Sequence, residues 1–516
     1  MIDKCINANL KLLQKFRTNN SGILTTGNSK NHSFNGLSAT IEFGRNIELK
    51  PDAFLSKDLN DNKDIRFRKG TEVKLSCSLL DYYISGSDLL PSSIKFPNFN
   101  NPEVDANSLK KQIIANIHNL SNQSKTHYKK NRFYRFLLPV EKGLSFQGDF
   151  YPYEFAKVDA ATNNALTINI EIENENYHFF STHIKKQHYI VIDSLNKVML
   201  ERFTQVVNSI FMTYAFLKGT YYGGLAHIFS YNDVELRRPI GIRVFESSET
   251  ISKGYEIHTT NPYKYMKFRS PKFIKNKKGM IERIGKDTAK NYMFEFPMEN
   301  YSKLCELILL RGSILRSFIL IIDCSNSPLE LKIPAFFVAL ENITNVVVNK
   351  GENNSGEIFE EKEINKQIKQ ISKEAAKKIK VLEQETRPKG LSSIELKERK
   401  ANYERLITKL HQINKGSNNQ KLAEPFEKFG YILSKDEENA LYIHRNKFIH
   451  GDDFFIPDLG FDKEFKELFH LSFLVYTLCA ILLLKLSGFS GYIVNLPKAY
   501  AYITKQKTSG RGLIKI

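Results

Sequence analysis

Hydrophobic and polar positions in the first third of the chain follow the short period of β-strands. Strict alternation runs through Leu166–Ile172, which is the pattern of a strand with one buried face. Mixed β-branched, aromatic and polar runs bounded by Gly, Pro, Asn and Asp predict further strands at Ser38–Leu49, Ile65–Leu79 and Phe133–Val140. Ser85–Asn107 is rich in Ser, Pro and Asn, and we expect a loop there.

Further along the chain the hydrophobic period lengthens to that of helices. Within Asp193–Leu217, apolar side chains from Val198 to Tyr214 recur at helical spacing. From Tyr301 onward the pattern is helical throughout. It predicts helices at Leu304–Ile322, Ala335–Val348 (after Pro334 as a first-turn residue), Glu424–His450 and Phe461–Leu486.

A charged segment, Glu357–Lys415, lies between these apolar helices. It is rich in Lys, Arg and Glu, and only a sparse apolar stripe runs through it. Pro388-Lys389-Gly390 breaks its helical pattern, which predicts two long, exposed helices that form a hairpin.

These patterns predict an α+β protein of several domains, in keeping with its 516 residues. We expect a β-rich N-terminal domain over residues 1–190, then a helix-containing middle region and basic linker over 191–290. An all-α, up-and-down helical domain should follow over 291–516, with the charged hairpin at 357–415 as an insertion.

The formal net charge of +19 favours polyanionic partners, of which nucleic acid and acidic membrane surfaces are the usual two. A general excess of lysine is the alternative explanation. Lys264–Lys290 holds ten Lys or Arg residues against two acids, beside Tyr263, Tyr265 and Phe268. This run is either a patch that contacts phosphates and stacks bases or a solvated linker.

Cysteine use and hydropathy indicate a cytoplasmic protein. The five cysteines are scattered and form no Cys-x-x-Cys pair, which argues against a disulfide framework or a structural zinc site. The N-terminal segment carries no apolar signal sequence. Leu471–Leu484 is strongly apolar, but its 14 residues fall short of the about 20 that span a membrane, so we expect a buried core helix and no stable membrane association.

The segment Leu441–Gly451 carries the strongest candidate chemistry. It reads Leu-Tyr-Ile-His-Arg-Asn-Lys-Phe-Ile-His-Gly and places Arg445 five residues before His450, with Asn446 directly after the arginine. With 19 Arg and 12 His residues, about 0.4 Arg-x4-His pairs are expected by chance, so the bare spacing says little. The polar residue after Arg445, the glycine after His450 and the surrounding helical pattern make the motif more specific.

In this motif and its helical surroundings, the C-terminal part resembles the HEPN superfamily. Many of its members are metal-independent ribonucleases, and the resemblance covers about residues 301–502. A β-rich first half followed by such a domain is similar to ApeA-like abortive-infection proteins. The resemblance implies a dimer in which the motifs of two subunits come together.

The residue types suit RNA cleavage by attack of the substrate's own 2′-hydroxyl. Histidine titrates near neutral pH, so His450 can act as acid or base. Arg445 stays charged and can bind two phosphate oxygens, and Asn446 lies one helical turn before His450. We therefore expect Arg445, Asn446 and His450 to be the catalytic residues, with no cofactor and no metal.

Structural explanations for the same residues remain open at this stage. A histidine followed by glycine is typical of a helix C-terminus, and Arg445 could simply pair with Asp436 or Glu438. His444 is expected to have a structural or modulatory role.

The expected function is that of an endoribonuclease acting as an anti-phage, abortive-infection or toxin-like effector. Its substrate would be tRNA or another cellular RNA. The N-terminal half would sense a trigger, such as a phage-derived one, or restrain the nuclease. The alternative is a non-catalytic module that binds nucleotide or RNA, or acts as a scaffold, in a larger assembly.

Overall fold

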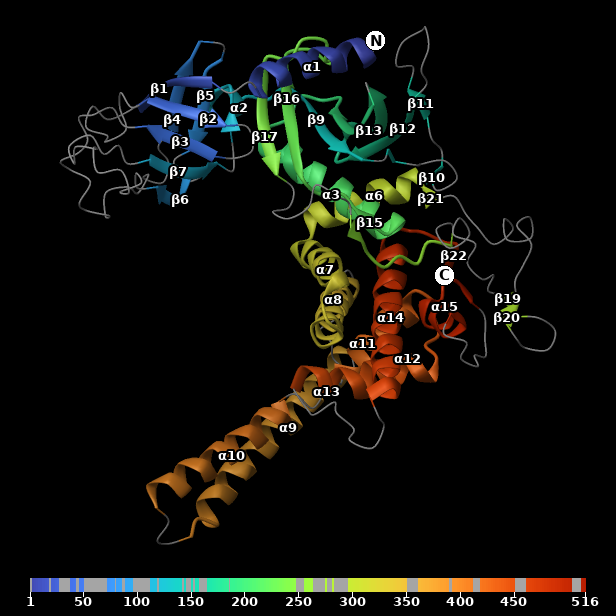
Figure 1. Cartoon of the computed structure of the whole chain (residues 1–516). Coiled ribbons are helices and arrows are strands. Elements are labelled where there is room, and N and C mark those ends of the chain that lie inside the picture. Colours follow the sequence, from blue (N-terminus) through green and yellow to red (C-terminus); the bar gives the residue numbers. More distant parts are fainter. Residues whose placement is uncertain are drawn as a thin grey trace. The chain divides into compact units, whose positions relative to one another are not determined.

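The structure is a computed structural model, and it confirms a β-rich first half followed by a helical part (Figure 1). By their contacts the residues fall into two compact units. The first holds residues 1–270, 285–310 and 487–491; the second holds 271–284, 311–486 and 492–516. The residues that the structure describes are 2–17, 20–26, 38–42, 46–50, 72–78, 80–85, 89–95, 112–117, 120–141, 143–144, 150–151, 154–156, 165–184, 186–246, 255–262, 274–275, 281–282, 296–349, 361–388, 392–411, 418–450, 461–503 and 512–516.

One long sheet, antiparallel at every pairing, dominates the first unit. Its strands in spatial order are β11 (Glu154–Ala156), β12 (Ala165–Ile172), β13 (Glu175–Ile184), β14 (Gln187–Ser194), β9 (Phe133–Val140), β16 (Leu225–Tyr231), β17 (Gly241–Glu246), β8 (Leu120–Ser121), β5 (Tyr82–Ser85), β4 (Glu72–Cys77), β1 (Asn20–Thr26), β2 (Ser38–Glu42), β3 (Asn46–Lys50), β7 (Gln112–Ile117) and β6 (Leu89–Lys95). Short β8 joins the two halves of this sheet. Several predicted strands are confirmed, since β9 coincides with Phe133–Val140, β12 contains the alternating run Leu166–Ile172, and β2 and β3 divide Ser38–Leu49 between them.

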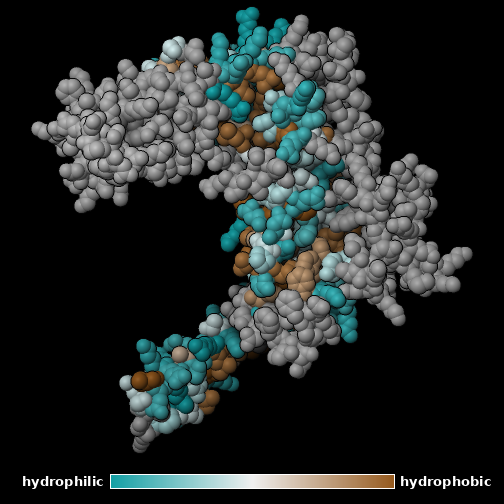
Figure 2. Space-filling model, in the orientation of Figure 1, coloured by the Kyte–Doolittle hydropathy of each residue, from teal (hydrophilic) through white to brown (hydrophobic). Residues whose placement is uncertain are grey.

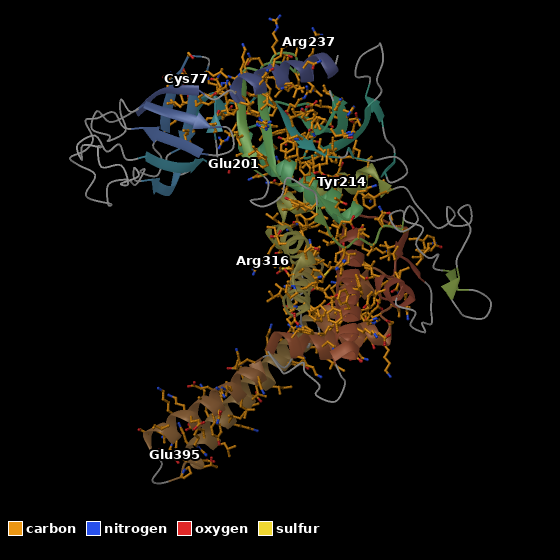
Figure 3. All side chains as sticks on the ribbon, in the orientation of Figure 1. Cys77, Glu201, Tyr214, Arg237, Arg316 and Glu395 are labelled. Carbon is orange, nitrogen blue, oxygen red and sulfur yellow. The ribbon has the colours of Figure 1, made fainter. Side chains whose placement is uncertain are left out.

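Two helices cover opposite faces of the β9–β14 part of the sheet (Figure 1). Leu137 on one face packs in a cluster with Phe16 of α1 (Ile2–Arg17). Its neighbour Phe136 points to the other face and meets Phe211 of α3 (Leu200–Lys218) edge to face, with ring centroids 5.4 Å apart. Both faces of these strands are therefore buried, and successive side chains alternate between the two cores. Tyr214 of α3 lies in the second core (Figure 3).

A buried ion pair ties α1 to this sheet. Arg135 and Asp193 lie opposite each other on β9 and β14 and are joined by two hydrogen bonds of 2.7 Å. Asn9 of α1 accepts a further hydrogen bond from Arg135 and donates to the hydroxyl of Tyr231. Because both charges are almost fully buried, the pair and its neighbours form a unit that loses stability if one member is removed.

Contacts place α6 (Met298–Leu310) with the first unit. The hydroxyl of Tyr301 donates to the carbonyl of Ile210 on α3 at 2.8 Å. Cys305 lies 3.4 Å from the hydroxyl of Thr213 on the same helix. The predicted helix Leu304–Ile322 is thus two helices, because α6 ends at Leu310 and α7 (Gly312–Asp323) begins after Arg311, which is extended.

The expected loop Ser85–Asn107 is wrong in part, because it contains β6. This strand lies at the edge of the sheet and its register shifts between Pro91 and Ser93. Proline lacks the N–H that an inner strand must donate, so an edge position with a bulge is where a strand tolerates it. The composition of the segment reflects this position and does not prevent a strand.

The remaining short elements are small pairs of strands and single turns. They are α2 (Lys125–Tyr128), β10 (Phe150–Tyr151) with β21 (Phe296–Pro297), β15 (Thr220–Tyr221) with β18 (Tyr255–Glu256), β19 (Ile274–Lys275) with β20 (Ile281–Glu282), and β22 (Tyr492–Val494) with β23 (Leu513–Lys515). The side chains of the basic run Lys264–Lys290 lie outside the described residues. Whether this run is a phosphate-contacting patch or a solvated linker therefore stays a prediction.

The second unit is built around two apolar helices, α8 (Leu329–Asn349) and α14 (Phe461–Leu486). Phe336 of α8 packs on Tyr476 of α14, and the thiol of Cys479 lies 3.6 Å from the carbonyl oxygen of Phe336. Around them lie the short 3₁₀ turn Cys324–Asn326 and the helices α11 (Asn418–Lys428), α12 (Lys435–Asn439), α13 (Arg445–His450) and α15 (Leu496–Ile503).

Both central helices are long and apolar enough to cross a membrane, and 56% and 72% of the respective apolar stretches are buried. Leu471–Leu484 is almost continuously buried within the second unit, as predicted.

Pro334 lies inside α8, which corrects the expectation that it occupies the first turn. The helix already begins at Leu329, and Pro334 has no N–H for the carbonyl of Glu330. An interior proline costs about 3 kcal/mol. Burial of Ile333, Phe336 and Phe337 beside it offsets this, at about 1.5–3 kcal/mol for each side chain.

The predicted hairpin is present as α9 (Lys362–Glu385) and α10 (Ser393–His411), which lie side by side (Figure 1). The hydroxyl of Ser372 donates to the carbonyl of Leu410 at 2.5 Å and fixes their register. At the tip, Ser392 and Glu395 exchange hydrogen bonds through backbone and side chain and cap α10 (Figure 3).

Candidate active site

The predicted helix Glu424–His450 is broken into several pieces, and the breaks position the motif. α11 ends near Gly430, whose φ of +68° is left-handed and closes the helix. Ser434 then opens α12 with a capping box to Glu437. These local signals override the apolar periodicity that predicted one continuous helix.

A π-helical turn, Ala440–His444, separates α12 from α13. Ala440 and Leu441 are fully buried and anchor the turn, while Ile443 is half exposed. A π-turn inserts extra backbone into a helix and is frequent at functional sites. Here it rotates the residues of α13 relative to those of α12, and Arg445 is the first residue after it.

Arg445 is held by a carboxylate from another helix. Its Nε donates to Oε1 of Glu341 on α8 at 2.6 Å, and its Nη2 donates to the same oxygen. The side chains of Arg445 and Glu341 are 15% and 31% exposed, so the pair is partly screened from water. The alternative partners Asp436 and Glu438 are therefore wrong, because a residue about a hundred positions away takes their place.

Asn446 completes the support of the arginine. Its Oδ1 accepts a hydrogen bond of 2.9 Å from Nη1 of Arg445, and its Nδ2 donates to the carbonyl of Tyr442 at 3.1 Å. The amide is thereby fixed at both ends. The guanidinium carries five N–H groups, of which these contacts use three. The other two, one on Nη1 and one on Nη2, have no acceptor within the described part of the chain and can donate to phosphate oxygens.

His450 is the last residue of α13, one helical turn after Asn446. Its side chain and Gly451 lie outside the described residues, so its assignment as acid or base stays a prediction. The structure brings Arg445 and Asn446 into direct contact and places the backbone of His450 on the same short helix.

A second polar cluster lies beside the motif and includes two histidines. Burial lowers the pKa of His444, with Lys447 adding to the effect and Glu467 opposing it. Burial also lowers the pKa of His470 on α14, where Asp436 and Glu467 oppose the shift. Both imidazoles are therefore neutral at pH 7. His444 also contributes to the lowered pKa of His470, so the two rings are close enough to affect each other's protonation.

Glu341 is the residue that sequence reasoning missed. Between Lys332 and Thr344, Glu341 and Asn342 are the only strongly polar side chains in an otherwise apolar run. A charged residue in a core helix is rarely buried without a partner. This signal pointed to an ion pair, but it did not identify Arg445 as the partner.

Two further observations bear on the chemistry of the site. Among the described residues, no group of three His, Cys, Asp or Glu side chains is arranged to hold a metal ion. Comparison of the chain with protein-family models, curated proteins and solved structures found no match.

Proposed function

We propose that this protein is a metal-independent endoribonuclease of the HEPN type. The observation that carries the proposal is the fixed guanidinium of Arg445. It lies directly after a π-turn and is oriented by Glu341 and Asn446, and two of its N–H groups have no acceptor among the described residues. Five residues further on stands a histidine, the side chain best suited to proton transfer near neutral pH.

Each residue has a distinct role in the proposed reaction. The 2′-hydroxyl of RNA attacks the adjacent phosphorus, and His450 takes its proton as general base or protonates the leaving 5′-oxygen as general acid. Arg445 binds the phosphate and stabilises the charge that develops on its oxygens. Asn446 positions Arg445 through Nη1. Glu341 fixes the guanidinium without removing its charge, because arginine stays protonated.

One subunit supplies one such histidine, whereas the reaction needs a base and an acid. The proposal therefore includes a two-fold dimer in which two Arg445/His450 motifs form one cleft. In this arrangement the β-rich half senses a trigger or restrains the nuclease, and the protein acts as a toxin-like defence effector on cellular RNA.

The decisive experiment is an RNA-cleavage assay with the full chain. Cleavage should persist in EDTA and leave 2′,3′-cyclic phosphate and 5′-hydroxyl ends. His450→Ala should lower the rate by about 10²–10⁴-fold or more, while circular dichroism shows the fold unchanged. His411→Ala, in α10, is the matched control and should cut at the normal rate. Full activity of the His450→Ala protein would refute the assignment.

A further inference from the structure

Five lysines of α9 lie along one side of the helix. At about 100° per residue, Lys366, Lys369, Lys373, Lys377 and Lys380 fall within an arc of about 80°. All five are exposed. At about 1.5 Å per residue they extend over about 21 Å of the helix. We call this set the lysine stripe.

The carboxylates of α9 are excluded from the lysine stripe. Glu363, Glu374, Glu383 and Glu385 all lie at least about 40° outside the arc. The carboxylate of Glu374 accepts a hydrogen bond from Gln370, and that of Glu383 pairs with Arg387. No carboxylate of α9 therefore lies within the arc of the stripe.

The lysine stripe begins beside the contact between the two helices and extends away from it around α9. Asn365, Ser372 and Ala376 are buried and lie on the side of α9 that faces α10, as the hydrogen bond from Ser372 to Leu410 shows. On the face seen in Figure 2, the surface of the hairpin is mainly hydrophilic. The lysines therefore project from a helix that packs against α10.

Part of the lysine stripe lines an open groove of about 500 Å³. Its described lining residues are Asn365, Lys366, Lys369, Gln370 and Lys373. Three ammonium groups and two amides offer many hydrogen-bond donors and few acceptors. This is the chemistry of a site for a chain of phosphates and sugar hydroxyls, because phosphates take the cations and hydroxyls can bond to amides.

We propose that the lysine stripe of α9 binds the sugar–phosphate backbone of RNA and delivers the substrate to the nuclease. RNA as the partner rests on the proposed function; the charge pattern itself identifies a linear polyanion. Such contacts carry no sequence information, so the stripe supplies affinity and leaves the choice of cleavage position to the active site.

An anionic membrane surface is the competing partner for a row of lysines. An interfacial helix needs a free apolar face opposite its charges. On that side of α9, Ile364, Ile371 and Leu382 are 39%, 65% and 49% exposed, so an apolar face is present. The amides that line the groove beside the lysines fit a sugar–phosphate chain, and together with the proposed function they favour RNA; the vesicle measurement below decides between the two partners.

The test compares two triple variants of the full-length protein. Lys366→Glu, Lys369→Glu and Lys373→Glu together alter the stripe. Lys397→Glu, Lys400→Glu and Lys409→Glu together make the same charge change at exposed positions of α10. Binding is measured by fluorescence anisotropy over a series of salt concentrations. The probe is a single-stranded 2′-O-methyl RNA, which lacks the attacking hydroxyl, so the result does not depend on cleavage.

The stripe variant should bind at least about tenfold more weakly, and the slope of log K against log salt should fall by about 2, since each lost contact contributes about 0.7. The α10 variant should change binding less than about threefold. A milder triple, Lys366→Gln, Lys369→Gln and Lys373→Gln, should act in the same direction with the helicity unchanged.

Equal losses in the stripe and α10 variants would overturn the inference, because general charge would then explain binding. It would equally be overturned if the stripe variant lost binding to phosphatidylserine vesicles but kept binding to RNA. Stripe-dependent binding by a protein that never cuts RNA would refute the proposed function and leave this inference standing.

Discussion

Glu341 accepts two N–H groups of Arg445 on a single carboxylate oxygen, and the two residues lie on different helices of the second unit. The second carboxylate oxygen takes no part in this contact, so the pair is not the symmetric fork in which arginine and carboxylate satisfy each other. Arg445 is thereby held in place, while one N–H on each of its Nη atoms has no acceptor within the described part of the chain.

Glu341→Gln should lower cleavage by about tenfold or more, chiefly through kcat, because the guanidinium loses the charged partner that orients it. Glu341→Asp, which keeps the charge, should recover part of the loss. Steady-state kinetics on a defined RNA would separate kcat from KM. Glu330→Gln, at an exposed glutamate of the same helix, is the control and should behave like the unaltered protein. Unchanged kcat in Glu341→Gln would show that the pair is only structural.

Arg445→Lys should abolish most cleavage although it keeps the positive charge. Lysine has a compact ammonium and cannot hold Glu341, Asn446 and a phosphate at once. We expect a loss of about 10²-fold or more in kcat/KM, close to that of Arg445→Ala. Arg316→Lys, at an exposed arginine of α7 (Figure 3), should have no effect. Activity of Arg445→Lys near the normal level would mean that charge alone suffices.

Exposed apolar side chains near the motif predict where the second copy binds. Ile443 in the π-turn is 50% exposed and Phe465 on α14 is 44% exposed. Ile443→Glu or Phe465→Glu should convert a dimer, or a higher even-numbered species, into a monomer and remove cleavage with it. Light scattering and the RNA assay measure the two effects. Ile371→Glu on the hairpin, which is 65% exposed, is the control. A monomer that still cuts RNA would refute the composite site.

The division into a β-rich first half and a helical second part, and several of the strands, were predictable from periodicity, and the hairpin was predictable from its charge and its Pro-Lys-Gly break. The exact helix ends were not, because they depend on competition between local terms and burial. Pro334 remains inside α8 because three buried neighbours outweigh the lost hydrogen bond. Between α11 and α12 the opposite occurs, since Gly430 and Ser434 end and restart the helix despite an apolar pattern.

The candidate site was predictable only in part. Spacing along the chain selected Arg445 and Asn446, and an ideal helix gave their relation to His450. Sequence spacing could not reveal the π-turn, since no residue type requires one. Nor could it reveal Glu341, because a contact across about a hundred residues depends on how α8 and α13 pack.

His227 should make the β-rich unit sensitive to acid. Its ring is fully buried on β16, and neither nitrogen has a hydrogen-bond partner among the described residues. Burial, with a smaller contribution from Arg17, lowers its pKa to about 3 from an ordinary value of 6.5. Between these values the unfolded chain binds a proton that the folded chain excludes. The free energy of unfolding is therefore unaffected by this histidine above pH 6.5. It falls as the pH drops toward 3, by up to about 1.4 kcal/mol per pH unit.

Urea unfolding over this range should show a shallower pH dependence for His227→Gln than for the unaltered protein. His183→Gln, at an exposed histidine of β13, should leave the slope as it is. Parallel curves for all three proteins would show that His227 does not set the acid limit.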